Sequence, residues 1–441
     1  MKRDIDAVLD AWKDKKNRLP LIMRGARQVG KSFAIASFGK RAFEHAVILN
    51  FEKTPEIKKC FNELDPKKIL NKLAIFLNVT IVPGKTLLFL DEIQECPEAL
   101  MALRYFREEC PELHVIAAGS LLEFVLEEQE FRMPVGRVQY LYMRPLSFYE
   151  FLQATGHHAF LAHMQQVTVK TGVDESIHQK GNQLVKQYMA LGGMPAVIQE
   201  YLETQDALNI YRLQASILQT YRDDFPKYAT KVQGAHLHRI FEEIPKRIGQ
   251  QIKYVHLDAT VRSTALKSAL FLLAKTGVIT PIFSTEGNGV PLSATEKTNL
   301  FKCLFLDIGL AVNACKLGAD IQFSEDVMTL NKGAIAEQFV GQELIANQDP
   351  YVNEPLYFWM RSHSGSQAEL DYVLSVNRLV LPVEVKSGKT GTLKSLLQFL
   401  SEKEAPFGIK LSQNTLSFDH KVLSVPLYLT AQVSRFVSEI Y

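Results

Sequence analysis

Gly25-Ala26-Arg27-Gln28-Val29-Gly30-Lys31-Ser32 is the stretch that decides the fold of the first part of this chain. It lies between a strand-like apolar segment, Leu19-Pro20-Leu21-Ile22-Met23, and a helix-forming segment that begins at Phe33. The glycines allow backbone N–H groups to wrap around an oxyanion, Lys31 reaches the β- and γ-phosphates, and the Ser32 hydroxyl binds Mg²⁺. The helix that follows points its positive end at the same phosphates. The stretch therefore predicts a phosphate-binding loop that holds ATP together with Mg²⁺.

A second motif at the end of an apolar run supports this prediction. Leu87-Leu88-Phe89-Leu90 leads directly into Asp91 and Glu92, as a buried parallel strand does where it reaches the ligand-binding edge of an α/β sheet. We expect Asp91 to hold Mg²⁺ and Glu92 to polarise the attacking water. A buried strand that merely ends in a solvated turn does not explain why the two acids lie where a phosphate-binding fold requires them.

Two more apolar segments predict further strands of the same sheet. They run from His45 to Phe51 and from His114 to Ser120, and helical segments separate the strands. Strands that alternate with helices indicate a parallel, doubly wound α/β sheet. The last strand ends on Gly119-Ser120, which makes the Ser120 hydroxyl a candidate for contact with the γ-phosphate or with the attacking water.

Arg137 follows Gly136 at a predicted junction between strand and loop. An arginine in this place is suited to stabilise the γ-phosphate of a neighbouring subunit as an arginine finger. A surface arginine in an ion pair explains the position equally well. The sequence leaves both roles for Arg137 open.

The order and spacing of several motifs resemble a known family. The motifs are GARQVGKS, LLFLDEIQECP, HVIAAGS, VGR and RPLSFYEFL, all within about residues 1–155. The set resembles the AAA+-type ATPase domain (AAA_14) of a widespread prokaryotic family that usually also carries a domain of unknown function, DUF4143. The resemblance implies an ATPase, and because AAA+ relatives commonly form rings, it implies a homo-oligomer with the nucleotide site between subunits. The usual threonine of the nucleotide loop is Ser32 here, which still supplies a hydroxyl for Mg²⁺. Gln94 is expected either near the γ-phosphate or in a contact at the start of a helix.

The overall composition is that of an ordinary globular chain with several domains. The chain has 441 residues, of which 47% are hydrophobic and 22% are charged, and its formal net charge is +2. This small charge argues against a nucleic-acid coat over the whole surface, although one basic face is compatible with it. The cysteines are scattered and lack paired-ligand spacing, which predicts neither a disulfide framework nor a zinc site. No signal peptide or apolar run of ~18 residues is recognisable, so we expect a cytoplasmic protein without a membrane partner.

Changes in pattern along the chain predict four parts. They are an ATPase core at 1–150, a helical lid at 151–235, a winged-helix-like module at 236–325 and a restriction-endonuclease-like α/β domain at 326–441. In the third part, a helix that ends at Gly277 precedes two strand-like segments joined by Gly287-Asn288-Gly289, which is the order of a winged helix. Such modules contact the DNA major groove in some proteins and serve as packing or protein-contact units in others. Positive charges that are scattered along the sequence are only weak evidence for a DNA-binding surface, so both interpretations stay open. These cations are Lys246, Arg247, Lys253, Arg262, Lys267 and Lys275.

The last part holds a second group of charged residues. Glu337 lies on a predicted helix and Asp371 on a predicted strand, and Glu384 and Lys386 lie on one face of the next strand. Carboxylates beside a lysine suit metal-assisted phosphodiester cleavage. Asp371 and Glu384 are expected to hold Mg²⁺, and Glu337 to complete the metal shell. Lys386 is expected to orient or deprotonate the attacking water. Solvated charges on edge strands are the alternative, but Pro382-Val383-Glu384-Val385 is apolar enough for burial, where unpaired ions are costly.

This second group resembles the site of the PD-(D/E)xK nuclease fold, although no proline directly precedes Asp371. Degenerate members of that fold keep the scaffold and bind DNA without cleaving it. The chain is therefore interpreted as an AAA+ ATPase that couples ATP hydrolysis to DNA binding or processing. The alternative is a nucleotide-switched regulatory or scaffolding protein with a catalytically inactive tail.

Overall fold

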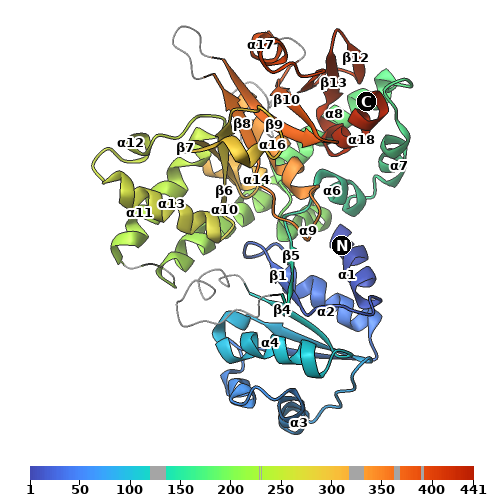
Figure 1. Ribbon diagram of the computed structural model, residues 1–441, viewed down its shortest axis with the longest axis vertical. Helices are drawn as coiled ribbons and strands as arrows, with labels where there is room; N and C mark the ends of the chain where they lie inside the picture. Colours follow the sequence, from blue (N-terminus) through green and yellow to red (C-terminus); the bar gives the residue numbers. More distant parts are fainter. Residues whose placement is uncertain (120–135, 228, 230, 317–331, 362–367, 389–391) are drawn as a thin grey trace. The chain divides into compact units, whose positions relative to one another are not determined.

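The computed structural model describes residues 1–119, 136–227, 229, 231–316, 332–361, 368–388 and 392–441 (Figure 1). Within these ranges the chain forms two compact units. The first comprises Met1–Arg144 and Asp349–Asn353, and the second comprises Pro145–Gln348 and Glu354–Tyr441. Each unit has its own β-sheet.

The first unit alternates helices and strands along the sequence. Its elements are α1 (Asp4–Lys13), β1 (Leu21–Arg24), α2 (Lys31–Ala42), β2 (His45–Asn50), α3 (Pro66–Leu77), β3 (Thr86–Asp91), α4 (Pro97–Glu109), β4 (His114–Ala118) and β5 (Gln139–Tyr142). The strands form one sheet in the order β2-β3-β4-β1-β5, and every pair in it is parallel. The prediction of an α/β fold with a parallel central sheet is therefore confirmed.

Helices cover both faces of this sheet. On one face α2 packs against β2, β3 and β4, and Trp12 of α1 lies against Phe38 of α2, with ring centroids 6.5 Å apart. On the other face, α3 and α4 share a buried apolar core with alternate strand residues such as Leu88 and Val115. Because all strands run in one direction, the carboxyl ends of β1 and β3 meet at the same edge, on either side of β4.

The second unit begins with helices and ends in a larger sheet. Its first elements are α6 (Phe148–Ala154), α7 (His158–Gln166), α8 (Glu175–Leu191), α9 (Pro195–Thr204), α10 (Ala207–Asp224), α11 (Lys231–Glu243), α12 (Tyr254–Leu257), α13 (Ser263–Lys275), β6 (Ile279–Thr285), β7 (Glu296–Phe305) and α14 (Ile308–Ala314). They are followed by α16 (Lys332–Ala346), β8 (Tyr357–Met360), β9 (Glu369–Val376), β10 (Leu379–Val385), α17 (Lys394–Lys403), β11 (Gly408–Ser412), β12 (Ser417–Asp419), β13 (Val422–Pro426) and α18 (Val433–Ile440). The helical stretch, the helix α13 and the strand pairs thus lie where the sequence pattern places them.

The helix and hairpin at α13, β6 and β7 have the order predicted for a winged helix, but the hairpin also belongs to a larger sheet. β6 pairs antiparallel with β7 and parallel with β8. The sheet runs in the order β12-β13-β11-β10-β9-β8-β6-β7. The predicted boundary near residue 325 therefore falls between elements that share one sheet, and the four-part division stays a prediction.

The helix α16 lies against this sheet and carries several buried polar side chains. Gln338 accepts a hydrogen bond from the Phe305 backbone N–H and donates one to the Phe305 carbonyl oxygen. Gln342 donates to the Tyr188 hydroxyl. These bonds satisfy polar groups in an otherwise apolar core. No helix among the described residues is long and apolar enough to cross a membrane.

Candidate functional sites

The predicted phosphate-binding loop connects β1 to α2 and has the backbone that its glycines permit. Gly25 has a φ of +144°, and a Cβ atom there would lie 2.2 Å from the Met143 carbonyl oxygen. Gly30 has a φ of +98° and immediately precedes the first turn of α2. Both positions require the freedom of glycine. The loop therefore ends on a helix N-terminus, where backbone N–H groups are available for an anion.

Lys31 is buried at the start of α2, and its ammonium group lies against its own loop. Nζ donates to the carbonyl oxygens of Gly25 and Ala26, each at 2.8 Å. Burial lowers the pKa of Lys31 to about 8, while Glu92 and Asp91 partly oppose that shift. A buried ammonium whose acceptors are neutral carbonyl oxygens, as these two are, gains stabilisation from an anion beside it. This state of Lys31 suits a residue that receives phosphate.

Ser32 and Asp91 are brought together across the sheet edge. Ser32 Oγ donates to Asp91 Oδ1 at 2.9 Å, and Asn50 Nδ2 at the end of β2 donates to Asp91 Oδ2 at 3.1 Å. Burial raises the pKa of Asp91, and the hydrogen bond from Ser32 partly counters this effect. A hydroxyl and a carboxylate are oxygen ligands of the kind that Mg²⁺ prefers. The donor set therefore fits the predicted magnesium ion.

Glu92 follows in a left-handed conformation, with a φ of +50°. Its Oε2 accepts a 2.7 Å hydrogen bond from Gln94 Nε2. A Cβ atom at Gly119 would lie 2.1 Å from Gln94 Oε1, so Gln94 fits between Glu92 and the end of β4. Gln94 Oε1 is buried without a hydrogen-bond partner among the described residues. The structure thus shows a hydrogen bond from Gln94 to Glu92, a contact that is not one of the two expected for Gln94 from the sequence.

Two further predicted site residues have less definite surroundings. Arg137 Nε forms a 2.8 Å ion pair with Glu108 Oε1, and the Arg137 side chain is 46% exposed. Arg104 also pairs with Glu108, at 3.2 Å. Within one chain Arg137 is therefore a surface arginine, and a role toward a second subunit stays a prediction. Ser120 lies outside the described residues.

Arg3, for which the sequence predicts no role, contacts the loop from the amino-terminal end of the chain. Its side chain is buried, and Nη1 donates to the Val29 carbonyl oxygen at 3.1 Å. Nη2 donates to the Arg144 carbonyl oxygen at 2.8 Å. A basic residue just before a surface helix gives no signal of such a contact in the sequence. The fold alone brings Arg3 to the loop.

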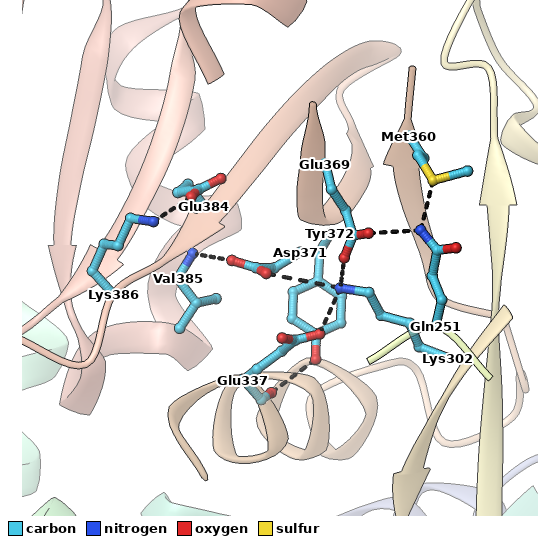
Figure 2. A network of polar contacts seen from close by, with 10 residues as sticks. All are labelled: Gln251, Lys302, Glu337, Met360, Glu369, Asp371, Tyr372, Glu384, Val385 and Lys386. Atoms are coloured by element: carbon cyan, nitrogen blue, oxygen red, sulfur yellow. Dashed lines mark hydrogen bonds and ion pairs between the residues drawn. The ribbon is translucent and has the colours of Figure 1, made fainter. Parts of the chain in front are cut away.

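The C-terminal charged residues come together in the second unit (Figure 2). The backbone N–H of Val385 donates to Asp371 Oδ2 at 2.7 Å. Lys386 Nζ donates to Glu384 Oε1 at 2.5 Å. Glu384 is 7% exposed, and its Oε2 has no hydrogen-bond partner among the residues that the structure describes. Burial raises the pKa of Glu384 to about 7, and the negative charge of Asp371 adds to this shift.

Another charged residue, Lys302 on β7, lies among three of the carboxylates. Its Nζ lies 3.0 Å from Glu337 Oε1, 2.6 Å from Glu369 Oε1 and 3.9 Å from Asp371 Oδ1. Figure 2 shows the three carboxylates converging on this ammonium group. Burial is the largest influence on Lys302 and alone would lower its pKa, but the charges of Glu337, Asp371 and Glu369 outweigh it and the pKa is raised. Burial also raises the pKa of Glu337 to about 8, with Lys302 opposing the shift.

The predicted magnesium ligands Glu337, Asp371 and Glu384 do not fit a metal as they are placed. Among the described residues, no group of three or more His, Cys, Asp or Glu side chains is arranged to hold a metal ion. Lys302 stands between Glu337 and Asp371, and Glu384 pairs with Lys386 instead. The sequence carried a signal for Lys302, since it lies in the apolar run Phe301 to Phe305, where a charge requires a partner.

Three family models match the sequence. Residues 17–152 match an AAA domain, AAA_14. Residues 182–321 match a domain of unknown function, DUF8612, and residues 332–428 match another, DUF4143. The AAA_14 and DUF4143 matches agree with the resemblance stated from the motifs, whereas none of the three models describes a nuclease. No curated protein matches the chain.

Solved structures with a similar arrangement share little sequence with this chain. The Walker-type ATPase PABY2304 of Pyrococcus abyssi is 16% identical, covering 71% of this chain and 95% of its own with a TM-score of 0.46. The ORC2 protein of Aeropyrum pernix, solved as ADPNP–ADP complexes, is 13% identical, covering 72% of this chain and 92% of its own with a TM-score of 0.35. The ORC1 protein of Aeropyrum pernix, solved in complex with DNA, is 11% identical. The match covers 71% of this chain and 90% of the ORC1 chain, with a TM-score of 0.29. Likenesses this weak carry no argument about function.

Together, the family models and the geometry at the edge of the parallel sheet show an AAA-type P-loop ATPase-like domain at residues 17–152, in a chain that also carries a DUF4143 domain at residues 332–428.

Proposed function

We propose that this protein binds ATP with Mg²⁺ and hydrolyses it in the first unit. The observation that carries the proposal is the 2.9 Å hydrogen bond from Ser32 Oγ to Asp91 Oδ1. It joins the end of the phosphate-binding loop to the end of β3, which are the two places where this chemistry requires oxygen ligands. The match of residues 17–152 to an AAA domain supports the same function.

Each residue of the site has a distinct task in this proposal. Backbone N–H groups of Gly25 to Ser32 and the Lys31 ammonium hold the phosphates, and Lys31 exchanges its carbonyl partners for phosphate oxygens. Ser32 and Asp91 hold Mg²⁺, which neutralises charge on the β- and γ-phosphates. Glu92 accepts a proton from the attacking water, and Gln94 fixes the orientation of the Glu92 carboxylate.

Two residues extend this site beyond the geometry described above. We assign Ser120 to sensing the γ-phosphate, and Arg137 to the γ-phosphate of a neighbouring subunit in a homo-oligomer. Arg137→Ala is then expected to abolish turnover and to preserve ATP binding, because the Glu108 ion pair is not part of the nucleotide site. Unchanged turnover would leave Arg137 as a surface arginine.

Binding and hydrolysis are tested separately on the full chain. Lys31→Ala is expected to remove both the binding of a fluorescent ATP analogue and the release of phosphate. Asp91→Asn is expected to keep part of the binding and lose its dependence on Mg²⁺. Lys386→Ala, in the other unit, is the matched control and is expected to retain both. The proposal fails if Lys31→Ala hydrolyses ATP at the native rate.

We also propose that the second unit contacts DNA and that ATP hydrolysis is coupled to this contact. The helix α13 and the hairpin that follows it support the proposal by their order and by cations such as Arg262 and Lys267. Other cations of the same module are engaged by the chain itself, since Lys246 and Arg247 both pair with Glu243. Plasmid and branched DNA are expected to change the rate of phosphate release.

The position of Lys302 favours the second candidate for the tail, a nucleotide-switched protein whose C-terminal part does not cleave DNA. In that case plasmid and branched DNA stay intact in the presence of Mg²⁺ and ATP. DNA cutting that is lost in Lys386→Ala would instead make the protein an ATP-gated nuclease. If DNA neither changes phosphate release nor binds, the C-terminal part acts on a partner other than DNA.

A further inference from the structure

Lys302 is the most deeply buried ammonium group in the described part of the second unit. Its side chain is 1% exposed, and it lies on β7 between the buried residues Phe301 and Cys303. A charge in such a place is stable only when opposite charges and hydrogen bonds replace its water. The chain therefore has to supply anions around Lys302.

Three carboxylates from two elements supply them. Glu337 comes from α16, and Glu369 and Asp371 come from one face of β9. Two of the carboxylates are fixed by a second contact: Gln251 Nε2 donates to Glu369 Oε2 at 2.8 Å, and the Val385 N–H donates to Asp371 Oδ2. The Lys302 Nζ also lies 5.2 Å from the centroid of the Phe358 ring. The cluster is thus organised around a cation that belongs to the chain itself.

A divalent cation at the same place would require several oxygen ligands at about 2.0–2.6 Å. The carboxylates that would provide them already face Nζ at 2.6 to 3.9 Å. Because Lys302 is tethered and packed, its effective local concentration far exceeds that of free Mg²⁺. Glu384, the remaining predicted ligand, is engaged by Lys386. A metal ion would therefore have to displace a buried lysine.

We propose that Lys302 takes the place of a divalent cation, so that the native cluster does not bind Mg²⁺ or Mn²⁺, and that removing its ammonium group opens a latent divalent-cation site made of Glu337, Glu369 and Asp371. A consequence is that the C-terminal part of the native chain does not cleave phosphodiesters by a metal-dependent route. The proposal does not rest on ATP hydrolysis, because it concerns other residues in the other unit.

The test is a titration of the full chain with Mn²⁺, without nucleotide, followed by electron paramagnetic resonance of the free ion. Asp91→Asn is present in every sample to remove the metal site of the first unit. With Lys302 intact, Asp371→Asn is expected to leave Mn²⁺ binding unchanged. Lys302→Met is expected to gain about one equivalent of bound Mn²⁺ per chain, and Lys302→Met with Asp371→Asn is expected to lose it.

Either half of the result can overturn the proposal. Mn²⁺ binding by the chain with native Lys302 that disappears in Asp371→Asn would do so, as would a folded Lys302→Met variant that gains no Mn²⁺. Lys302→Met loses a buried cation, so its folding is checked by circular dichroism with and without Mn²⁺. If Lys302→Met folds only with Mn²⁺, the proposal is supported. If Lys302→Met folds neither with nor without Mn²⁺, the proposal is decided by comparing the Mn²⁺ binding of the chain with native Lys302 before and after Asp371→Asn.

Discussion

Two buried lysines illustrate, at the scale of single residues, how surroundings determine role. Among the described residues, the hydrogen-bond acceptors of Lys31 Nζ are two neutral carbonyl oxygens, and burial lowers the pKa of Lys31 to about 8 despite the charges of Glu92 and Asp91. Lys302 faces three carboxylates, which raise its pKa despite burial. The first ammonium group gains from an incoming anion, whereas the second already has its anions. This contrast supports the proposed phosphate binding at Lys31 and the proposed structural role of the Lys302 charge.

Gly25→Ala is expected to remove ATP binding. The added Cβ would meet the Met143 carbonyl oxygen at 2.2 Å, and the φ of +144° is one that alanine avoids, at a cost of about 1–3 kcal/mol from the backbone alone. Gly234→Ala is the matched control, since a Cβ atom there would meet no atom of another described segment within 4 Å. Titration with a fluorescent ATP analogue and the melting temperature report both variants. Native affinity in Gly25→Ala would contradict the account of the loop.

Gln94→Leu is expected to lower kcat by on the order of 10- to 100-fold and to leave KM nearly unchanged. The reason is that the Gln94 amide holds the Glu92 carboxylate, and a misplaced base loses rate rather than binding. Gln179→Leu removes a similar hydrogen bond, to the exposed Glu175, and serves as the control. Steady-state phosphate release separates the two parameters. A rise in KM of the same size, with kcat unchanged, would show instead that Gln94 contributes to ATP binding.

At the scale of elements, His114 links β4 to α1 and creates a pH dependence. Its ring lies edge-on to Trp12 at 5.6 Å, and burial lowers its pKa to about 4, with Arg18 adding to the shift. The unfolded chain then binds more protons than the folded one between pH 6.5 and 4. Stability is full above pH 6.5 and falls by up to about 3 kcal/mol as the pH drops through this window.

His114→Gln is expected to lose this slope relative to the native residue. The chain contains two tryptophans, so unfolding is followed by Trp12 fluorescence in a Trp359→Phe background. Subtracting the curve of His114→Gln removes the contribution of titrating carboxylates, which both proteins share. If the free energies of unfolding of the two proteins change in parallel from pH 7 to pH 4, His114 has the same pKa in the folded and the unfolded chain.

The sequence predicts some of these elements well and others not at all. Strands β1, β3 and β4 are short apolar runs next to glycines or acids, so local pattern is enough to place them, and with them Lys31, Ser32, Asp91 and Glu92. The parallel pairing of β6 with β8 joins segments far apart in the chain and has no local signal. The same holds for the approach of Lys302 to Asp371, although the charge within an apolar strand indicated that a partner exists.

Across the chain as a whole, metal-dependent chemistry is proposed for the first unit alone. EDTA is therefore expected to stop phosphate release without lowering the melting temperature reported by Trp359 in a Trp12→Phe background. Lys302 provides the positive charge that a metal would otherwise supply in the second unit. A fall in that melting temperature on chelation, restored by Mg²⁺, would show that the second unit holds a structural metal.

We propose that Ser32, Asp91 and Glu92 together form one ATP-hydrolysing centre. The most direct measurement is a single-turnover assay of the full chain with Mg²⁺ and radiolabelled ATP, comparing the native protein with Glu92→Gln. Both proteins are expected to retain ATP on a filter, the native protein is expected to convert it to ADP, and Glu92→Gln is expected to hold it unhydrolysed. Hydrolysis by Glu92→Gln at the native rate, or a native protein that retains no ATP, would contradict this proposal.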